Sequence, residues 1–211
     1  MKNFLKNKNT ACRPRFSEGS AGFTIIEVVV ALGVVVTGVI AGLTLTTYNL
    51  NVAVASDFKL IAANLAREGV EAVREVRDSN WLENNPWDMG LTDLAGYRLT
   101  ANFDSSANLW SFNVQTTDIA NCDNCKIYLD KASGVYSHNA LNSPTNFKRE
   151  IILQQICWQD AVGDEVVLNP GLSCEDQEQE LAGLEVHSLV TWLETGKPQQ
   201  LEAVDKLYNW R

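Results

Sequence analysis

The sequence lacks charge and proline over two unusually long stretches. No Asp, Glu, Lys or Arg occurs from Val28 to Ser56, and no proline occurs between Pro14 and Pro86. An apolar run of about 20 residues is long enough to cross the hydrocarbon core of a bilayer as a helix. Proline is the residue most able to break a helix, so its absence leaves the helix free to continue. The two absences argue against a loop-rich N-terminal segment and predict one long helix.

Residues typical of catalytic sites are also scarce. The chain has two histidines, His138 and His187, and we find no acid/base pair to name. It contains no Gly-x-Ser-x-Gly string and no Gly-x-x-x-x-Gly-Lys-[Ser/Thr] string, which excludes the usual nucleophile elbow and the P-loop. We therefore predict a protein that is not an enzyme, with no catalytic residues, no cofactor and no metal.

Basic residues are rare outside the first 22 positions. Residues 1–22 carry a net charge of +4 and the remainder carries −13, which together give the −9 of the whole chain. Basic residues stay on the cytoplasmic side of a membrane segment, so we expect the N-terminus inside and the acidic bulk outside. An acidic bulk argues against general nucleic-acid binding, which needs Lys and Arg. The acid-rich segments 118–124 and 175–180 lack the spacing of a known calcium loop and are interpreted as solvated loops.

We divide the chain into four parts by composition. Residues 1–22 form a basic leader, 23–56 the membrane-spanning and assembly half of the helix, 57–80 its amphipathic half, and 81–211 a β-rich extracytoplasmic head domain. From residue 57 to 78, apolar side chains recur at helical spacing on one face. The economical interpretation is a single helix from about residue 24 to about residue 78. The alternative is a bend near Asn49–Asn51 followed by a separate surface helix.

The head domain shows the alternation of β-strands. Turn residues divide it into eight candidate strands: Tyr97–Phe103, Leu109–Thr116, Ile127–Asp130, Val135–Ser137, Phe147–Gln159, Val166–Leu168, Gly183–Leu193 and Gln200–Val204. The one-sided half of the helix and this β-rich remainder predict an α+β fold, in which the helix packs on an antiparallel sheet. The core is expected to hold the six tryptophans, Trp81, Trp87, Trp110, Trp158, Trp192 and Trp210.

The boundary of the leader has an unusual order. A secretory signal peptide places its small-residue cleavage site after the apolar region, but here the small residues Ser20-Ala21-Gly22 precede it. The string Gly22-Phe23-Thr24-Ile25-Ile26-Glu27 with the apolar run after it resembles the prepilin signal of type IV pilins and pseudopilins. The resemblance implies that a prepilin peptidase cuts between Gly22 and Phe23 and methylates the new amine of Phe23.

Glu27 is the one charged residue at the start of the apolar run. A carboxylate in hydrocarbon costs a few kcal/mol unless it is paired or reaches the interface. After cleavage the amine of Phe23 lies one helical turn away, and the amine of a neighbouring subunit is an alternative partner. The resemblance implies that Glu27 sets the stagger between subunits during assembly. Gly38 and Gly42, four residues apart, would let such helices approach closely.

Weaker likeness continues along the chain. The stretches 67–81, 128–130, 134–137 and 147–149 resemble parts of some minor-pilin-like sequences. The expected function is thus a minor pilin or pseudopilin subunit, whose partners would be the prepilin peptidase, other pilin subunits, the inner-membrane assembly platform and membrane lipid. Two alternatives stay open: a filament-associated adhesin or DNA-uptake pilin, and a monomeric membrane-anchored extracytoplasmic enzyme.

The five cysteines fit this interpretation once the leader is removed. The cut would remove Cys12 and leave Cys122, Cys125, Cys157 and Cys174, an even number in a compartment that permits disulfides. The favoured pairing is Cys122–Cys125 with Cys157–Cys174. A crossed pairing, free thiols or a zinc site remain as alternatives, the last with Cys157 and Cys174, or the two histidines, as the further ligands.

Overall fold

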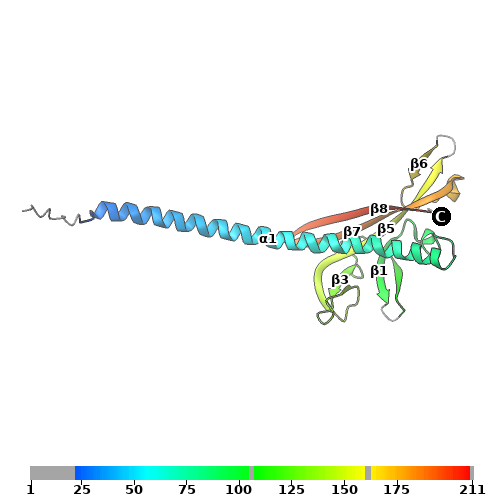
Figure 1. Ribbon diagram of the computed structural model, residues 1–211, viewed down its shortest axis with the longest axis horizontal. Coiled ribbons are helices and arrows are strands. Elements are labelled where there is room, and N and C mark those ends of the chain that lie inside the picture. The colour runs from blue at the N-terminus through cyan, green and yellow to red at the C-terminus, as the bar shows by residue number, and fades with distance from the viewer. Residues whose placement is uncertain (1–21, 105–106, 160–162, 210–211) are drawn as a thin grey trace, which may run out of the picture. The chain divides into compact units, whose positions relative to one another are not determined.

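The computed structural model describes residues 22–104, 107–159 and 163–209, and these form one long helix and an antiparallel sheet (Figure 1). The predicted α+β class is confirmed. The chain divides into two compact units, Met1–Leu50 and Asn51–Arg211. The elements are α1 (Ile25–Leu82), the 3-10 turns η1 (Thr92–Leu94) and η2 (Glu175–Gln177), and the strands β1 (Arg98–Asp104), β2 (Leu109–Gln115), β3 (Lys126–Leu129), β4 (Tyr136–Ser137), β5 (Ser143–Gln159), β6 (Asp164–Val167), β7 (Glu180–Glu194) and β8 (Lys197–Tyr208).

Local features of the chain mark both ends of helix α1. The hydroxyl of Thr24 accepts a bond from the Glu27 backbone N–H at 3.3 Å, as an N-cap does. The helix is assigned without a break through residues 49–51. The predicted end near Asp78–Asn80 was too early, because Trp81 is buried and extends the apolar face by one more turn. Asn84, with φ of 60°, then adopts the left-handed conformation that commonly follows a helix end.

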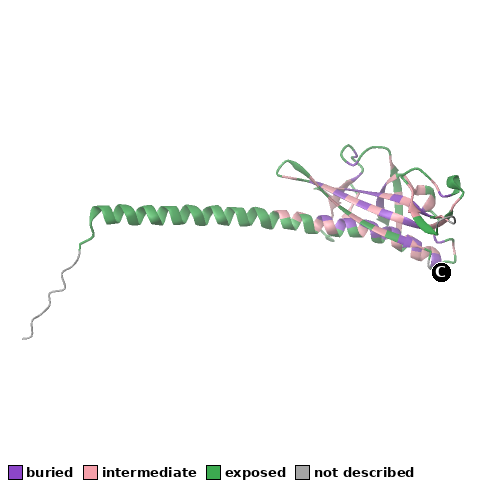
Figure 2. Cartoon of the chain, turned by 90° about the horizontal axis from the view of Figure 1, so that it is seen from above, coloured by how far each residue is buried: buried purple, intermediate pink, exposed green. Residues whose placement is uncertain are grey.

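The second part of α1 has one buried face, as predicted. Its buried positions follow a helical repeat along one face, and Figure 2 shows purple segments only in this part of α1. They are Ala62, Leu65, Ala66, Gly69, Val70, Ala72, Val73, Arg77 and Trp81. Four of these nine are alanine or glycine, so the helix backbone can approach the sheet closely there.

Strand β5 organises the sheet. One edge of β5 pairs with β7 from Lys148 to Trp158, and β7 pairs in turn with β8. The other edge is shared along its length by β3, then β1, then β6. Figure 1 shows β1 and β3 on one side of α1 and β7 and β8 on the other. All these pairings are antiparallel, so the described sheet matches the predicted type.

Strands β5, β6, β7 and β8 are longer than predicted, and partner strands explain the extensions at the start of β5 and at the end of β8. β5 begins at Ser143 instead of Phe147, because Ser143 and Pro144 pair with β3. β8 continues to Tyr208 instead of ending at Val204, because its pairing with β7 runs to the end of that strand and buries Leu207. The added start of β5 holds proline and polar residues, and the added end of β8 holds charged residues. Neither composition is typical of a strand, so the sequence did not predict these extensions.

The core lies between α1 and the sheet in two clusters. The larger gathers side chains such as Val73, Leu99, Ile151 and Leu184, and the smaller is built around Phe147 and its neighbours. The tryptophan prediction holds only in part. Trp81, Trp87 and Trp192 are buried, Trp110 is half-buried, Trp158 is exposed, and Trp210 lies outside the described residues.

Gly69 marks the closest approach of α1 to the sheet. A Cβ atom at this position would lie 2.2 Å from the Ser188 hydroxyl oxygen and 3.1 Å from the Ser188 Cβ. It would also lie 3.3 Å from the Ile151 Cδ1. Ser188 is fully buried on β7, so it has little room to move aside. The helix can pack at this depth only because residue 69 has no side chain.

We predict that Gly69→Ala lowers the free energy of unfolding of the head domain by up to about 2 kcal/mol. Overpacking costs about 1–3 kcal/mol, and alanine regains only about 1 kcal/mol of helix propensity. Urea unfolding of the full chain in detergent, followed by tryptophan fluorescence, measures the difference. The matched control is Asn64→Ala on the exposed face, which should leave stability unchanged or higher. Ser188→Gly should partly relieve the Gly69→Ala defect in a double-mutant cycle; a Gly69→Ala protein as stable as the control would contradict the packing.

Candidate functional site

The first half of α1 is the most unusual surface of the protein. Every residue from 22 to 54 is exposed (Figure 2). Eighteen of them, from Phe23 to Val54, are large apolar residues at least 45% exposed. A soluble monomer rarely exposes a contiguous apolar surface of this size, so such a surface marks contact with a membrane or with another protein.

The free-energy cost of exposing this surface to water indicates what kind of surface it is. Burying one large apolar side chain is worth about 1.5–3 kcal/mol, so leaving this surface in water forgoes some tens of kcal/mol. A folded domain is stable by only about 5–15 kcal/mol. By length and composition α1 could span a membrane. Residues 23–54 thus have the character of a surface that lipid or other apolar helices cover.

Four threonines within this stretch have hydroxyl groups that are hydrogen-bonded to the helix backbone. The hydroxyls of the threonines donate to backbone carbonyls three or four residues earlier, at 2.9–3.2 Å. They are Thr37, Thr44, Thr46 and Thr47. Such bonds satisfy the donors of these four hydroxyls in hydrocarbon, where an unpaired polar group is costly. We did not predict this use of threonine from the sequence, although each threonine within the predicted helix has a backbone carbonyl one turn before it.

Glu27 and the predicted cleavage site lie together at the start of α1. Gly22, Phe23 and Thr24 precede the helix, and Glu27 occupies its first turn, where the helix dipole favours an acidic group. Within the described part of the chain, Glu27 forms no salt bridge. The predicted leader residues 1–21, including Cys12, lie outside the described residues.

Gly38 and Gly42 face open space. A Cβ atom at either position would meet nothing within 4 Å apart from the helix backbone itself. Within this chain, therefore, packing requires glycine at neither position, in contrast to Gly69. Their small size is useful only against a surface outside the described residues.

The four cysteines of the head domain form the favoured pair of disulfides. Cys122 is bonded to Cys125, and Cys157 to Cys174, with Cα–Cα distances of 5.3 and 5.5 Å. All four are buried. Among the described residues no group of three or more His, Cys, Asp or Glu could hold a metal ion.

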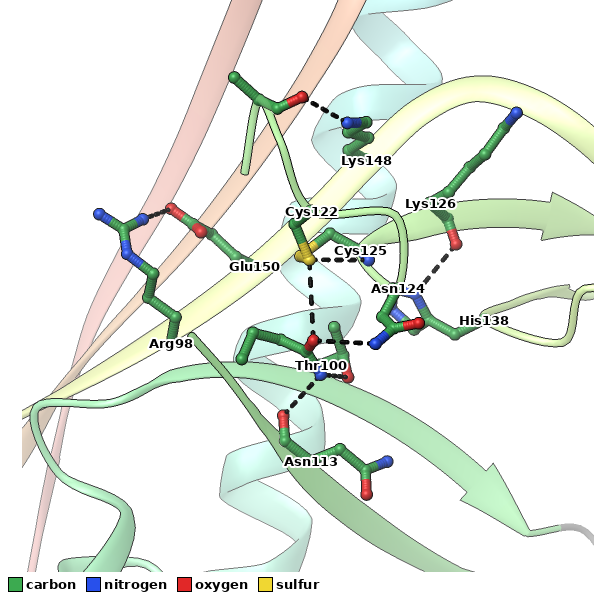
Figure 3. The surroundings of a disulfide bond; sticks show 12 residues. Arg98, Thr100, Asn113, Cys122, Asn124, Cys125, Lys126, His138, Lys148 and Glu150 are labelled. Carbon is green, nitrogen blue, oxygen red and sulfur yellow. Dashed lines mark hydrogen bonds and ion pairs between the residues drawn. A yellow bond between two sulfur atoms is a disulfide. The ribbon is translucent and has the colours of Figure 1, made fainter. Parts of the chain in front are cut away.

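The Cys122–Cys125 disulfide fixes a loop to the sheet (Figure 3). The Cys125 carbonyl accepts a hydrogen bond from the backbone N–H of Arg149 at 2.8 Å. On one side of the disulfide, Lys148 Nζ donates to the Ala120 carbonyl at 2.6 Å. On the other side, Asn124 Nδ2 donates to Gln115 Oε1 at 3.2 Å. The segment 118–125 is thus tied to β5 and to β2.

The acid-rich segments do not converge on a site. Glu175–Gln177 forms the short turn η2, and its residues are exposed. In the segment 118–124, Asp118 pairs with Arg98 at 3.1 Å. Both segments are consistent with the interpretation as solvated loops.

His138 is held neutral inside the head domain. Its Nδ1 lies 3.0 Å from the Lys126 carbonyl oxygen, which can only accept, so Nδ1 carries the proton. Its Nε2 is buried and has no hydrogen-bond partner among the described residues. Burial, with the nearby positive charge of Arg149 as the second cause, lowers the pKa of His138 from 6.5 to about 4. His187, by contrast, lies between Glu185 and Glu202 at 2.9 and 2.8 Å.

The chain matches no family model, no curated protein and no solved structure. The prepilin-like interpretation therefore depends on the residues of the chain itself.

We predict that the two disulfides differ in their contribution to stability. Cys157–Cys174 spans 17 positions and Cys122–Cys125 spans three. Loop-closure entropy assigns about 3 kcal/mol to the first and about 2 kcal/mol to the second. Paired Cys→Ser variants, compared by urea unfolding, test this order. Equal losses, or a larger loss for the 122–125 pair, would contradict it.

We predict that His138 makes the head domain less stable as pH falls from about 6.5 to about 4. The pKa of His138 is lowered on folding, so the unfolded state binds a proton that the folded state refuses within this window. The full effect below the window is about 3 kcal/mol. The wild type should therefore lose about 3 kcal/mol more unfolding free energy between pH 7 and pH 4 than His138→Asn does. The asparagine amide of this variant can still donate to the Lys126 carbonyl. An identical pH dependence of the two proteins would show that His138 titrates normally.

Proposed function

We propose that this chain is a pilin-like subunit of the type IV pilin and pseudopilin class, and that it serves as a minor component of a pilus or secretion filament. The observation that carries the proposal is Glu27. It is the only charged residue between Phe23 and Ser56, and it stands in the first turn of an otherwise apolar, fully exposed helical segment. The leader order around Gly22 supports the same assignment.

In the proposed sequence of events, the apolar half of α1 first anchors the chain in the cytoplasmic membrane. The basic leader stays inside and the head domain lies outside. A prepilin peptidase then removes residues 1–22 and methylates the amine of Phe23. The subunit finally leaves the lipid by exchanging lipid contacts for contacts with the helices of other subunits, under the action of the inner-membrane assembly platform.

The charge of Glu27 favours the filament over lipid in that exchange. In lipid the cleaved chain offers Glu27 only the amine of its own Phe23, one helical turn away, whereas in a filament the amine of Phe23 on an adjacent subunit would supply a second partner. A paired charge is far less costly in an apolar environment than an unpaired one. Gly38 and Gly42 support the same step, since two helices can approach closely where side chains are absent. The proposal assigns the chain no chemical reaction, cofactor or nucleic-acid ligand.

We predict that Glu27→Ala is inserted in the membrane and processed normally, yet enters filaments about 100-fold less efficiently. Breaking a buried ion pair by removing one partner costs about 3–5 kcal/mol, which corresponds to a factor of that size or more. The measurement compares the amount of chain in sheared filaments with the amount in membranes, in a host that carries the matching assembly machinery.

Two control variants sharpen this experiment. Glu27→Gln has the size of the native residue without its charge and should fail like Glu27→Ala, whereas Glu27→Asp keeps the charge and should retain partial incorporation. Asn64→Ala, on the exposed face of the amphipathic half, should incorporate normally. Normal filament incorporation of Glu27→Ala would refute the proposed role of Glu27.

A further inference from the structure

The head domain contains a cleft that the proposed function does not use. Its volume is about 650 Å³, within the range of small-molecule sites. It lies on the edge of β5 where two hairpins diverge. β1 pairs with β5 only at Arg98 and Leu99, opposite Ile152 and Ile151, before it leaves with β2. β3 pairs with β5 from Lys148 toward Ser143. The residue between these two pairings whose side chain faces α1 is Arg149.

Arg149 lies at the base of the cleft and is 2% exposed. Its guanidinium donates to the Leu65 carbonyl at 3.1 Å and to the Ala101 carbonyl at 3.4 Å, and it lies 3.4 Å from the carboxylate of Glu68. Its Nε has no hydrogen-bond partner among the described residues. A buried donor without a partner is costly, so the site favours a ligand that brings an acceptor.

The walls of the cleft offer acceptors instead. Glu68 and Glu75 lie seven residues apart on one face of α1, and Asp130 lies at the end of β3. Glu75 accepts one bond from Trp110 Nε1 at 2.8 Å. Asp130 accepts bonds from the Ala132 N–H and the Ser133 hydroxyl, which lower the pKa of Asp130 and keep it ionised. Each carboxylate has about four lone-pair sites, so unused acceptors remain at every one.

Aromatic side chains form the remaining wall. Trp110 and Phe103 pack against each other with ring centroids 5.1 Å apart, and Tyr136 lines the cleft from β4. Phe103 is 45% exposed and Val135, in the turn before β4, is 56% exposed. The entrance is therefore apolar, while the base and the helix wall are charged.

This combination selects one class of ligand. An anion brings acceptors for Arg149 but is repelled by three carboxylates. An ammonium group brings donors for the carboxylates but offers no acceptor and is repelled by Arg149. A hydroxyl both donates and accepts, so a neutral polyhydroxylated molecule satisfies both kinds of wall, and the C–H face of a sugar ring can pack on the apolar face of Trp110. We infer that the cleft between the β1–β2 hairpin, the β3–β4 hairpin and α1 binds a neutral sugar unit of a glycan.

The inference concerns the head domain alone and does not depend on filament assembly. The experiment applies the full chain in detergent micelles to an array of neutral oligosaccharides of hexoses and N-acetylhexosamines, with sialylated and glucosamine-containing counterparts beside them. The best neutral sugar is then titrated against the wild type and against two cleft variants, Trp110→Ala and Glu75→Ala. The controls are Trp158→Ala, an exposed tryptophan on β5, and Glu71→Ala, an exposed acid one turn from Glu75; neither lines the cleft.

The expected result is binding of a neutral sugar that weakens about 10-fold or more in each cleft variant, as loss of one charged hydrogen-bond acceptor or one stacking surface implies. The controls should bind as the wild type does. Glu75 is exposed, so its replacement keeps the test valid even if Trp110→Ala folds poorly. Three outcomes would each overturn the inference: no neutral sugar is bound, the positively charged sugars bind best, or neutral binding persists in both cleft variants.

Discussion

The apolar first half of α1 must be covered, and this constraint governs the rest of the molecule. Residues 22–54 contact no other element of the described chain closely enough to be buried. A surface of this kind is stable against lipid or against similar helices, and exchange between these two environments is cheap because both are apolar. Glu27 responds differently to the two environments, because its charge is less costly in apolar surroundings where a cation lies nearby. In the proposed function, anchoring and assembly therefore use the same residues.

The second half of α1 faces the opposite requirement, since its apolar face must bind the chain's own sheet. Gly69 lets the helix backbone approach β7, and Arg149 fixes its position along the sheet. Arg149 joins Leu65 of α1 and Ala101 of β1 by hydrogen bonds, while its own backbone N–H binds the disulfide loop at Cys125. A buried charge that contacts this many elements cannot tolerate their separation, because each lost bond would leave a donor unsatisfied. The cleft lies above this same residue, so stability and the inferred ligand site share one side chain.

Much of this architecture is predictable from the sequence, because it depends on local patterns. The absence of proline and the change from all-round to one-sided apolarity predict α1 to within a few residues, and alternation with turn residues predicts all eight strands. Assigning Cys12 to the leader left an even number of cysteines, and the favoured one of their possible pairings is the one observed. Strand ends were less predictable, since Pro144 and the charged end of β8 are ordered by their partner strands and not by their own composition.

The cleft could not be predicted, because its residues come from α1, two hairpins and β5 and meet only in the folded chain. One signal was nevertheless present. In the run Phe147, Arg149, Ile151, Leu153 every second residue points inward, and an arginine at an inward position of a core strand is an exception that calls for partners. The close approach at Gly69 has no such signal, because a glycine within a helix does not reveal which surface it meets.

The central claim is that Gly22–Glu27 is a prepilin signal, and the chemistry of the mature N-terminus tests it most directly. The measurement is N-terminal peptide mass spectrometry of the chain purified from membranes that contain a prepilin peptidase. The predicted N-terminal residue is Phe23 carrying one methyl group on its amine, with the apolar half of α1 retained. A chain that keeps residues 1–22, or one cut after the apolar segment as a secretory signal would be, would contradict the assignment.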